Sequence, residues 1–588
     1  MTSSLKTSAL ETIFGHHPDG AKSQEGIDAP AWHGLAAKKR ASNLAKIPQE
    51  WRLPRDTLKD IHEESKISVL DVPRSCGLLT TDELRITEDF DATGLSEQLS
   101  TGALKAYDVA KAFCKRAAIA HQLTNCLTEI FFDQALERAK MLDEYYEREK
   151  KPLGPLHGIP ISLKDSYVVK NVHHTLGYIS FLDRPPAENN SPIVQILLDL
   201  GAVLYVKTNI PQTFMTADSE NNVFGRTLNP RRLTLTAGGS SGGEGALIAM
   251  RGSLLGVATD VAGSIRIPAL CNGVYGFKPT ANRLPFGGNA APGRLGSPSP
   301  IVPLAGPLAT TLRDCELLAR SVVGAEPWLL DDGALNVPWR QTLLPSPSPS
   351  SSSVTNGATT TTTTKPLRFG LITEDSTRPL HPPVLRALRT AANKLSAAGH
   401  TIVPLDSSSY SLPSIISVAA LAWKFFALDP TKTPLRIIQD GGEPLIKSLH
   451  TVRVPQNDGW TASLDALWEL VVERKRITKA FHDVVVGERL DALLTVPHCA
   501  TAVPHDTYGI PGHTVLANVL DWPAAVLPFG AAEKGRDAEF LREGVEYVPP
   551  YAPDEVEGAP CAVQVLGRPM RDEELLRDLE VVEKVLRA

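Results

Sequence analysis

Three short segments of the chain concentrate residues that could support nucleophilic catalysis. The first, GIPISLKDS at residues 158–166, is an apolar run that ends in Lys164 and Asp165. A lysine at the end of a buried strand is costly unless it pairs with a carboxylate or loses its proton. Two interpretations follow: Lys164 pairs with Asp165 or reaches water, or it is a desolvated, neutral amine that acts as a general base.

The second segment, AGGSSGGEGALIAM at residues 237–250, places glycines around Ser240 and Ser241 ahead of a helical run. Glycine-rich turns of this kind often bind phosphate at a helix N-terminus. The Gly-Lys-Ser/Thr ending of a P-loop is absent, however, and Glu244 would repel a phosphate group. The stretch GGSSG matches GxSxG, the nucleophile elbow of α/β-hydrolases, but this pattern is too short to be specific.

The third segment is GVATDVAGSIRIP, residues 256–268. It predicts a tight turn from Asp260 to Ser264 after an apolar strand. The backbone N–H groups presented by that turn belong to Val261, Ala262 and Gly263. Successive N–H groups that point into one concavity can form an oxyanion hole, and a serine at the end of the turn would lie beside the developing charge. Taken alone, the segment is better explained as an ordinary structural turn.

In this order and in these surroundings, the three segments resemble the amidase signature family. The resemblance covers about residues 85–588, and the stretches KTNIPQTFMTADSENNVFGRTLNP and DVAGSIRIPALCNGVYGFKPT are similar to fungal acetamidase-type amidases. It implies that Lys164 is the catalytic lysine, Ser240 the proton relay and Ser264 the nucleophile. It further implies a small-molecule carboxamide substrate, which is hydrolysed without a cofactor to a carboxylic acid and ammonia or an amine.

The resemblance also extends to the residues around these three. The matching residues expected to hold the site in place are Ser241, Asp260 and Arg266. Ala262 is a departure, because the family usually has glycine there; alanine serves if its φ is negative, since an oxyanion hole uses only the N–H. Met215 is predicted to line the substrate pocket, together with Thr216 and the 424–460 region.

The elements that must position these groups alternate along the chain. Short apolar runs at 159–163, 202–206 and 255–258 predict strands, and the run at 193–200 predicts a helix. A helical pattern is predicted throughout 99–150. Strands that alternate with helices predict an α/β fold in which a large mixed β-sheet lies between helical layers. The family resemblance implies a sheet of about eleven strands.

Two regions fall outside this pattern. Residues 1–84 are polar and contain proline breaks, and we predict an N-terminal helical arm that lies on a main domain formed by 85–588. Residues 345–365 are rich in Ser, Thr and Pro, so they bury too little apolar area to offset the entropy of ordering. A disordered surface insertion is favoured over an interdomain linker, because strand-like sequence resumes directly after it.

Composition narrows the classes of function. The 588 residues include 60 Lys and Arg against 66 Asp and Glu, a net charge of −6, which gives no electrostatic reason to expect nucleic acid as a partner. The seven cysteines are odd in number and form no CxxC pair, and the spacing of His498, His505 and His513 fits no zinc pattern, so no metal site is expected. Without a secretory signal or an apolar run of about 18 residues, a cytoplasmic location and no membrane span are predicted.

Other activities remain open at this point. An α/β-hydrolase would use Ser240 as the nucleophile and a later histidine as the base. An amidotransferase subunit would share the Ser-Ser-Lys triad but would need a partner and a channel for ammonia. A catalytically inactive binding protein would usually have lost one member of the triad, and all three are present. The sequence identifies neither the amide nor the metabolic role, and it leaves open whether the chain forms a homodimer.

Deleting residues 346–364 should leave amide hydrolysis nearly unchanged, because the length of a loop changes its closure entropy only weakly. The measurements are the yield of soluble protein and the specific activity, each beside the full-length chain. Loss of soluble protein on deletion would show that the segment is structural.

Overall fold

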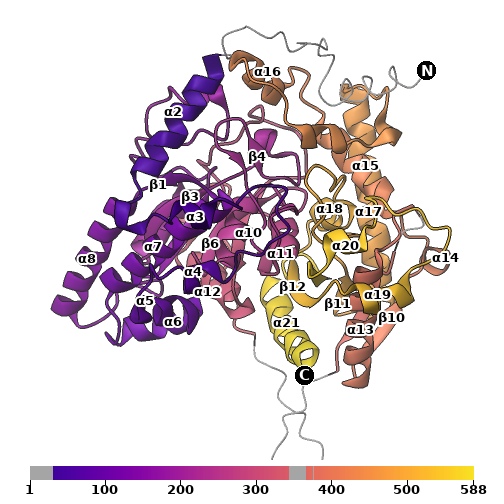
Figure 1. The fold of residues 1–588 in the computed structure, drawn as a ribbon. Coiled ribbons are helices and arrows are strands. Elements are labelled where there is room, and N and C mark those ends of the chain that lie inside the picture. Colours follow the sequence, from indigo (N-terminus) through magenta and orange to yellow (C-terminus); the bar gives the residue numbers. More distant parts are fainter. Residues whose placement is uncertain (1–30, 343–365, 375–376) are drawn as a thin grey trace, which may run out of the picture.

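The computed structural model describes residues 31–342, 366–374 and 377–588 (Figure 1). Within these ranges one mixed sheet contains eleven strands, in the order β1-β3-β2-β6-β8-β7-β12-β13-β11-β9-β10. Two parallel groups, β3-β2-β6 and β11-β9-β10, flank a central antiparallel region. The predicted large mixed sheet of an α/β fold is confirmed.

The strands are short and are separated by long stretches of other structure. Their bounds are β1 Leu127–Ile130, β2 Pro160–Lys164, β3 Val203–Thr208, β6 Leu255–Asp260, β7 Tyr275–Lys278, β8 Leu304–Ala309, β9 Arg368–Leu371, β10 Thr401–Pro404, β11 Ala492–Thr495, β12 Ala524–Ala531 and β13 Pro560–Leu566. A separate two-stranded sheet pairs β4 (Glu220–Asn221) with β5 (Gly225–Arg226).

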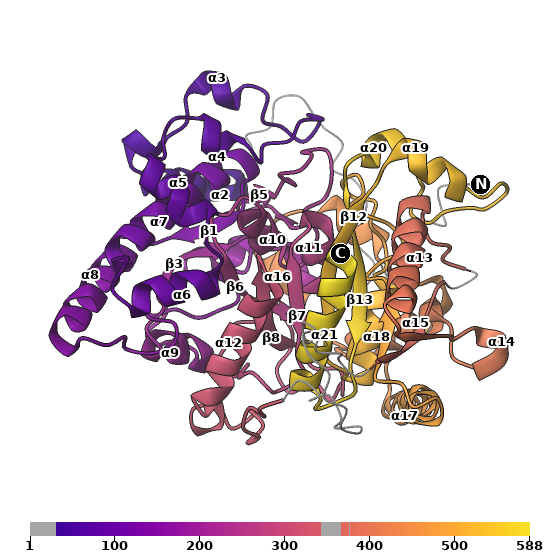
Figure 2. The same ribbon diagram turned by 90° about the horizontal axis from the view of Figure 1, so that it is seen from below.

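Helices cover both faces of the large sheet, because successive side chains of a strand point to opposite faces. Ala258 of β6 packs in a cluster with α10 (Gly242–Ala249) and α11 (Arg266–Asn272). Its neighbour Val257 belongs instead to the larger core that includes residues of α12 and α21. Figure 2 views the molecule from the side of α12 and α21.

The remaining helices surround these layers. In the first half of the chain they are α6 Ala92–Ser100, α7 Ala106–Thr124, α8 Phe132–Glu149, α9 Pro192–Asp199 and α12 Leu312–Gly324. In the second half they are α13 Pro382–Ala397, α14 Ser407–Tyr410, α15 Ile415–Phe426, α16 Thr433–Asp440, α17 Leu464–Gly487, α18 Gly512–Leu520, α19 Lys534–Asp537, α20 Pro553–Val556 and α21 Asp572–Arg587. None of the described helices is both long enough and apolar enough to cross a membrane.

The structure contains the predicted strands and helix, and the prediction is wrong at one place, residues 127–130. The runs predicted as strands are β2, β3 and β6, and the run predicted as a helix is α9. The helical pattern predicted throughout 99–150 is wrong at 127–130, where β1 lies between α7 and α8. α7 ends at Thr124, and the next residue, Asn125, caps it with a φ of 53° in the left-handed region. The four-residue strand is too short to show its own periodicity.

The described part of the predicted arm consists mostly of helices that lie along the main body (Figure 1). They are α2 Ala31–Ala45, α3 Arg55–Leu58, α4 Val72–Ser75 and α5 Thr81–Glu88. On α2, Lys39 Nζ donates to Glu129 Oε1 at 2.5 Å and Asn43 Nδ2 donates to the carbonyl oxygen of Thr128 at 2.5 Å. Residues 1–30 of the arm and the predicted disordered insertion at 345–365 lie outside the described residues.

Lys39→Met should destabilise the fold by about 1–3 kcal/mol, because Glu129 is almost fully buried and would lose its nearest cation. The measurement is the melting temperature from thermal unfolding. Lys38→Met is the matched control, because Lys38 is an exposed neighbour on the same helix. Equal melting temperatures for the two variants would contradict a role of Lys39 in docking the arm.

Candidate active site

Lys164 and the turn that carries Ser264 lie at the carboxyl ends of two parallel strands, and Ser240 contacts Lys164. Lys164 is the last residue of β2, and Asp260 is the last residue of β6, its parallel neighbour. Because parallel strands end at the same edge of a sheet, these two ends lie side by side. Ser240 directly precedes the N-terminal region of α10, and Ser264 lies in the turn between β6 and α11.

Lys164 is fully buried, and its amine contacts hydroxyl groups. Nζ donates to Ser240 Oγ and to Thr259 Oγ1, each at 2.6 Å. Burial lowers the pKa of Lys164 to about 7, although the negative charges of Asp260 and Glu244 oppose this shift. A substantial fraction of the side chain is therefore neutral near pH 7, as a general base requires.

Asp165, the other predicted partner of Lys164, is engaged elsewhere. Its carboxylate accepts hydrogen bonds from Thr128 Oγ1 at 2.6 Å and from the N–H of Leu176 at 2.8 Å. It also forms an ion pair with the buried Lys207, with Oδ1 and Nζ 3.5 Å apart. Lys164 therefore neither forms an ion pair with Asp165 nor reaches water.

The glycine-rich segment forms a tight turn in which the Gly239–Ser240 peptide bond is cis. A Cβ atom at position 239 would lie 2.4 Å from a backbone oxygen of the neighbouring loop, so only glycine fits there. Ser219 Oγ donates to the carbonyl oxygen of Gly238 and accepts from the N–H of Gly242, both at 2.9 Å. One side chain therefore holds the turn on both sides of Ser240.

Asp260 organises the turn that carries Ser264. Its carboxylate accepts two hydrogen bonds from Arg266, at 3.0 and 3.1 Å, and one from Asn518 Nδ2 at 2.9 Å. Burial by itself raises the pKa of Asp260, but Arg266 and Asn518 outweigh it, so the net pKa is lowered. Arg266 is fully buried and donates further to Asn518, Thr514 and Gln564.

The sequence predicts that Ser241 holds the site together with Asp260 and Arg266, but its side chain differs from theirs. Its hydroxyl is buried and has no hydrogen-bond partner among the described residues. Asp260 and Arg266 are thus hydrogen-bonded to each other behind the turn, whereas the Ser241 side chain contributes no hydrogen bond.

The N–H groups of the turn differ in their availability. The N–H of Gly263 donates to Asp260 Oδ1 at 2.8 Å, so this predicted oxyanion donor is already engaged. The N–H groups of Val261 and Ala262 have no acceptor within the described part of the chain. Gly263 has φ +127°, and a Cβ there would lie 2.2 Å from Thr514 Oγ1, so the position requires glycine. Ala262 has no positive φ, which satisfies the condition under which alanine replaces glycine.

Ser264 opens onto a small apolar cavity of about 20 Å³. Its side chain is almost buried, and among the described residues its hydroxyl has no hydrogen-bond partner. The apolar residues that line the cavity are Phe214, Met215, Ala217, Val261, Ala262, Ile267, Trp423, Val452 and Pro511. Met215 and Thr216 are among the residues that line this cavity, and Val452 comes from the 424–460 region; that the cavity binds substrate stays a prediction.

Sequence reasoning missed the contact of Thr259 with Lys164 and the burial of Glu244. Thr259 directly precedes Asp260 on the strand next to Lys164, and its hydroxyl group at that strand end was an available signal. Glu244 is fully buried and accepts hydrogen bonds from Ser162 Oγ and, at 2.7 Å, from Thr208 Oγ1. Burial raises the pKa of Glu244 to about 7 although both hydrogen bonds lower it.

The histidines of the 498–513 region serve packing and a polar network. The His498 ring stacks on Tyr508 with centroids 3.9 Å apart, and His505 Nδ1 lies 3.4 Å from Asp218 Oδ1. No group of three His, Cys, Asp or Glu side chains that could hold a metal occurs in the described ranges.

Comparison with known proteins identifies the family of the chain. The Amidase family model matches residues 108–576. The chain is 39% identical over 559 residues to an amidase of Gibberella moniliformis, which covers 95% of this chain and 99% of that protein. It is 37% identical over 578 residues to an acetamidase of Aspergillus oryzae, and this match covers 95% of this chain and 100% of that protein. The solved structure of a fatty acid amide hydrolase matches with a TM-score of 0.84 and 30% identity. This match covers 95% of this chain and 96% of the hydrolase chain. The predicted resemblance is confirmed, and the chain belongs to the amidase family of hydrolases that act on amide bonds.

Proposed function

We propose that the chain hydrolyses a carboxamide through an acyl-enzyme on Ser264, with Ser240 as the proton relay and Lys164 as the base. One observation carries the proposal: a buried Lys164 Nζ lies 2.6 Å from Ser240 Oγ, beside the cavity onto which Ser264 opens. Membership of the amidase family supports an amide as the substrate. The acetamidase relatives support a small acyl group.

Acylation begins when neutral Lys164 accepts the proton of Ser240, which takes the proton of Ser264. The Ser264 oxygen attacks the amide carbonyl carbon, and negative charge develops on the carbonyl oxygen. The N–H groups of Val261 and Ala262 are free to stabilise that charge, each by roughly 3–4 kcal/mol. Gly263, predicted as a third donor, contributes through its hydrogen bond to Asp260, which holds the turn in shape.

The second half of the reaction uses the same relay in reverse. Protonated Lys164 returns its proton through Ser240 to the leaving nitrogen, the C–N bond breaks, and ammonia or an amine departs. Water then attacks the acyl carbon as it loses a proton along the same path to Lys164. The bond between the acyl carbon and Ser264 Oγ breaks, Ser264 regains a proton through Ser240, and the acid is released. Thr259 acts as a positioning residue, since its oxygen accepts a second N–H of Lys164 and orients the amine.

The alternative activities receive less support. In an α/β-hydrolase a histidine would activate Ser240, whereas the hydrogen bond to Ser240 Oγ comes from Lys164. An amidotransferase subunit would need a partner chain, yet the chain matches relatives named amidase and acetamidase over nearly their whole lengths, which favours a free-standing enzyme. The homodimer and the cytoplasmic location stay predictions, and sedimentation velocity would test the first.

Ser264→Ala should lower amide turnover by at least about 1,000-fold without unfolding the protein, because its hydroxyl alone can form the acyl-enzyme. A fluorophosphonate probe followed by peptide mass spectrometry should label Ser264. Ser241→Ala is the matched control, since Ser241 lies in the same site without a hydrogen-bond partner among the described residues. Labelling of Ser240 in place of Ser264 would favour the α/β-hydrolase mechanism.

Lys164→Arg should be nearly as inactive as Lys164→Ala, because a guanidinium keeps its charge and accepts no proton. In the wild type, protonation of Lys164 removes the base, so kcat/KM should fall as the pH drops below about 7. The measurements are steady-state kinetics from pH 5 to 9 and circular dichroism of each variant. A folded arginine variant with a third of wild-type activity would make Lys164 a structural cation.

A further inference from the structure

A second apolar cavity lies next to the one at Ser264. Its volume is about 60 Å³, against about 20 Å³ for the first. Apart from the residues that it shares with the first cavity, its apolar lining consists of Phe426, Ala427, Pro434 and Leu435, and Thr213, Asp429 and Lys432 complete its rim. Both cavities are bounded by Met215, Trp423 and Val452. These three residues therefore form a wall between the two spaces.

Two of the three wall residues are fixed. Trp423 Nε1 donates to the carbonyl oxygen of Val452 at 3.1 Å, and both side chains are buried. The Trp423 ring also packs edge-on against Phe426, with centroids 5.6 Å apart. Met215 is different, because it is only partly buried and has an unbranched side chain with three rotatable bonds. Met215 is therefore the movable part of the wall.

The backbone that carries Met215 is held on both sides. Immediately before it, Thr213 and Phe214 have φ values of 67° and 66°, a left-handed conformation that non-glycine residues adopt only when their surroundings impose it. Immediately after it, Thr216 Oγ1 donates to Ser448 Oγ at 2.8 Å. A change of side chain at position 215 should therefore alter the wall without moving the loop.

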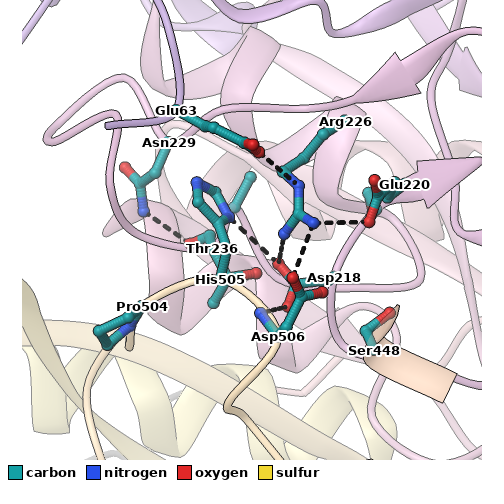
Figure 3. A network of polar contacts seen from close by, with 12 residues as sticks. Glu63, Asp218, Glu220, Arg226, Asn229, Thr236, Ser448, Pro504, His505 and Asp506 are labelled. Atoms are coloured by element: carbon teal, nitrogen blue, oxygen red, sulfur yellow. Dashed lines mark hydrogen bonds and ion pairs between the residues drawn. The ribbon is translucent and has the colours of Figure 1, made fainter. Parts of the chain in front are cut away.

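A charged cluster anchors the same loop at Asp218, two residues after Thr216 (Figure 3). Asp218 is buried and accepts from the N–H of Asp506 at 2.7 Å, and it lies within ion-pair distance of Arg226 and His505. Arg226 in turn pairs with Glu63, Glu220 and Asp506. This cluster ties the Met215 loop to the described arm and to the 505–506 turn.

We infer that Met215 sets the length of acyl chain that the site accepts, because its side chain closes off the second cavity, which would otherwise receive the hydrocarbon tail of a longer amide. A cavity needs about 10–15 Å³ to hold one water molecule, so the space at Ser264 suits a group of one or two carbons. Beyond Met215, the larger space offers apolar walls for further methylenes. The inference rests on the proposed function and assigns short aliphatic carboxamides as the wild-type substrate class.

Met215→Ala should join the two cavities and raise the ratio of kcat/KM for hexanamide to that for acetamide by about tenfold or more, since each buried methylene contributes up to about fourfold. Met215→Leu is the matched control and should keep the wild-type ratio, because leucine conserves the volume. Met215→Val, a smaller truncation, should shift the ratio in the same direction if the alanine variant does not fold. An unchanged ratio in a folded, active truncation variant would overturn the inference.

A second substitution tests where the added chain lies. Ala427→Leu fills the second cavity, so the double variant Met215→Ala/Ala427→Leu should lose the gain for hexanamide and keep the acetamide turnover of Met215→Ala. A gain for hexanamide that survives Ala427→Leu would place the chain elsewhere and refute the subsite.

Binding without turnover separates this inference from the proposed function. In the Ser264→Ala background, calorimetry should show hexanamide binding about tenfold or more tightly when Met215 is also alanine, with acetamide binding unchanged. Equal hexanamide affinities would overturn the inference whatever the reaction mechanism. Full amide turnover by Ser264→Ala alone would instead overturn only the proposed nucleophile.

Discussion

The arrangement of the site depends on a buried lysine whose hydrogen-bond partners are hydroxyl groups rather than carboxylates. A carboxylate in contact would stabilise the ammonium form and keep the pKa near that of a free lysine. Ser240 and Thr259 satisfy N–H donors of Lys164 without supplying an opposite charge. Burial then dominates, and the amine reaches a pKa of about 7. A base of this strength can take a proton from a serine and return it to a leaving nitrogen.

Two neighbouring carboxylates each have another cationic partner, so they do not pair with Lys164 and its pKa stays low. Asp165, adjacent in sequence, is turned toward Lys207, and Asp260 is compensated by Arg266. The Asp260–Arg266 pair also has a geometric role, because Asp260 accepts the N–H groups of Gly263 and Ile265 and so shapes the turn that carries Ser264. One buried ion pair thus limits the charge felt by Lys164 and leaves two neighbouring N–H groups free.

The proposed catalytic groups and the walls of the cavity come from different kinds of structure. Lys164 and the Ser264 turn lie at the ends of adjacent parallel strands, whose hydrogen-bonded register fixes their separation. The pocket walls come from the loop of Met215 and from α15, segments about 200 residues apart in the sequence. Substitutions in these walls can change the shape of the pocket while the strand ends keep their geometry, so one reaction is compatible with different substrates.

The sequence by itself determined the family, the three candidate catalytic residues and the strands β2 and β6, because contiguous motifs and hydrophobic periodicity are local properties. It also indicated that Ala262 could replace a glycine, since only the sign of φ mattered. Tertiary structure alone decided that Gly263 gives its N–H to Asp260, that Glu244 is buried among hydroxyl groups, and that Trp423 closes the pocket. The four-residue β1 likewise emerges only from its pairing with β3. These features depend on contacts between segments far apart in the chain, which local patterns do not encode.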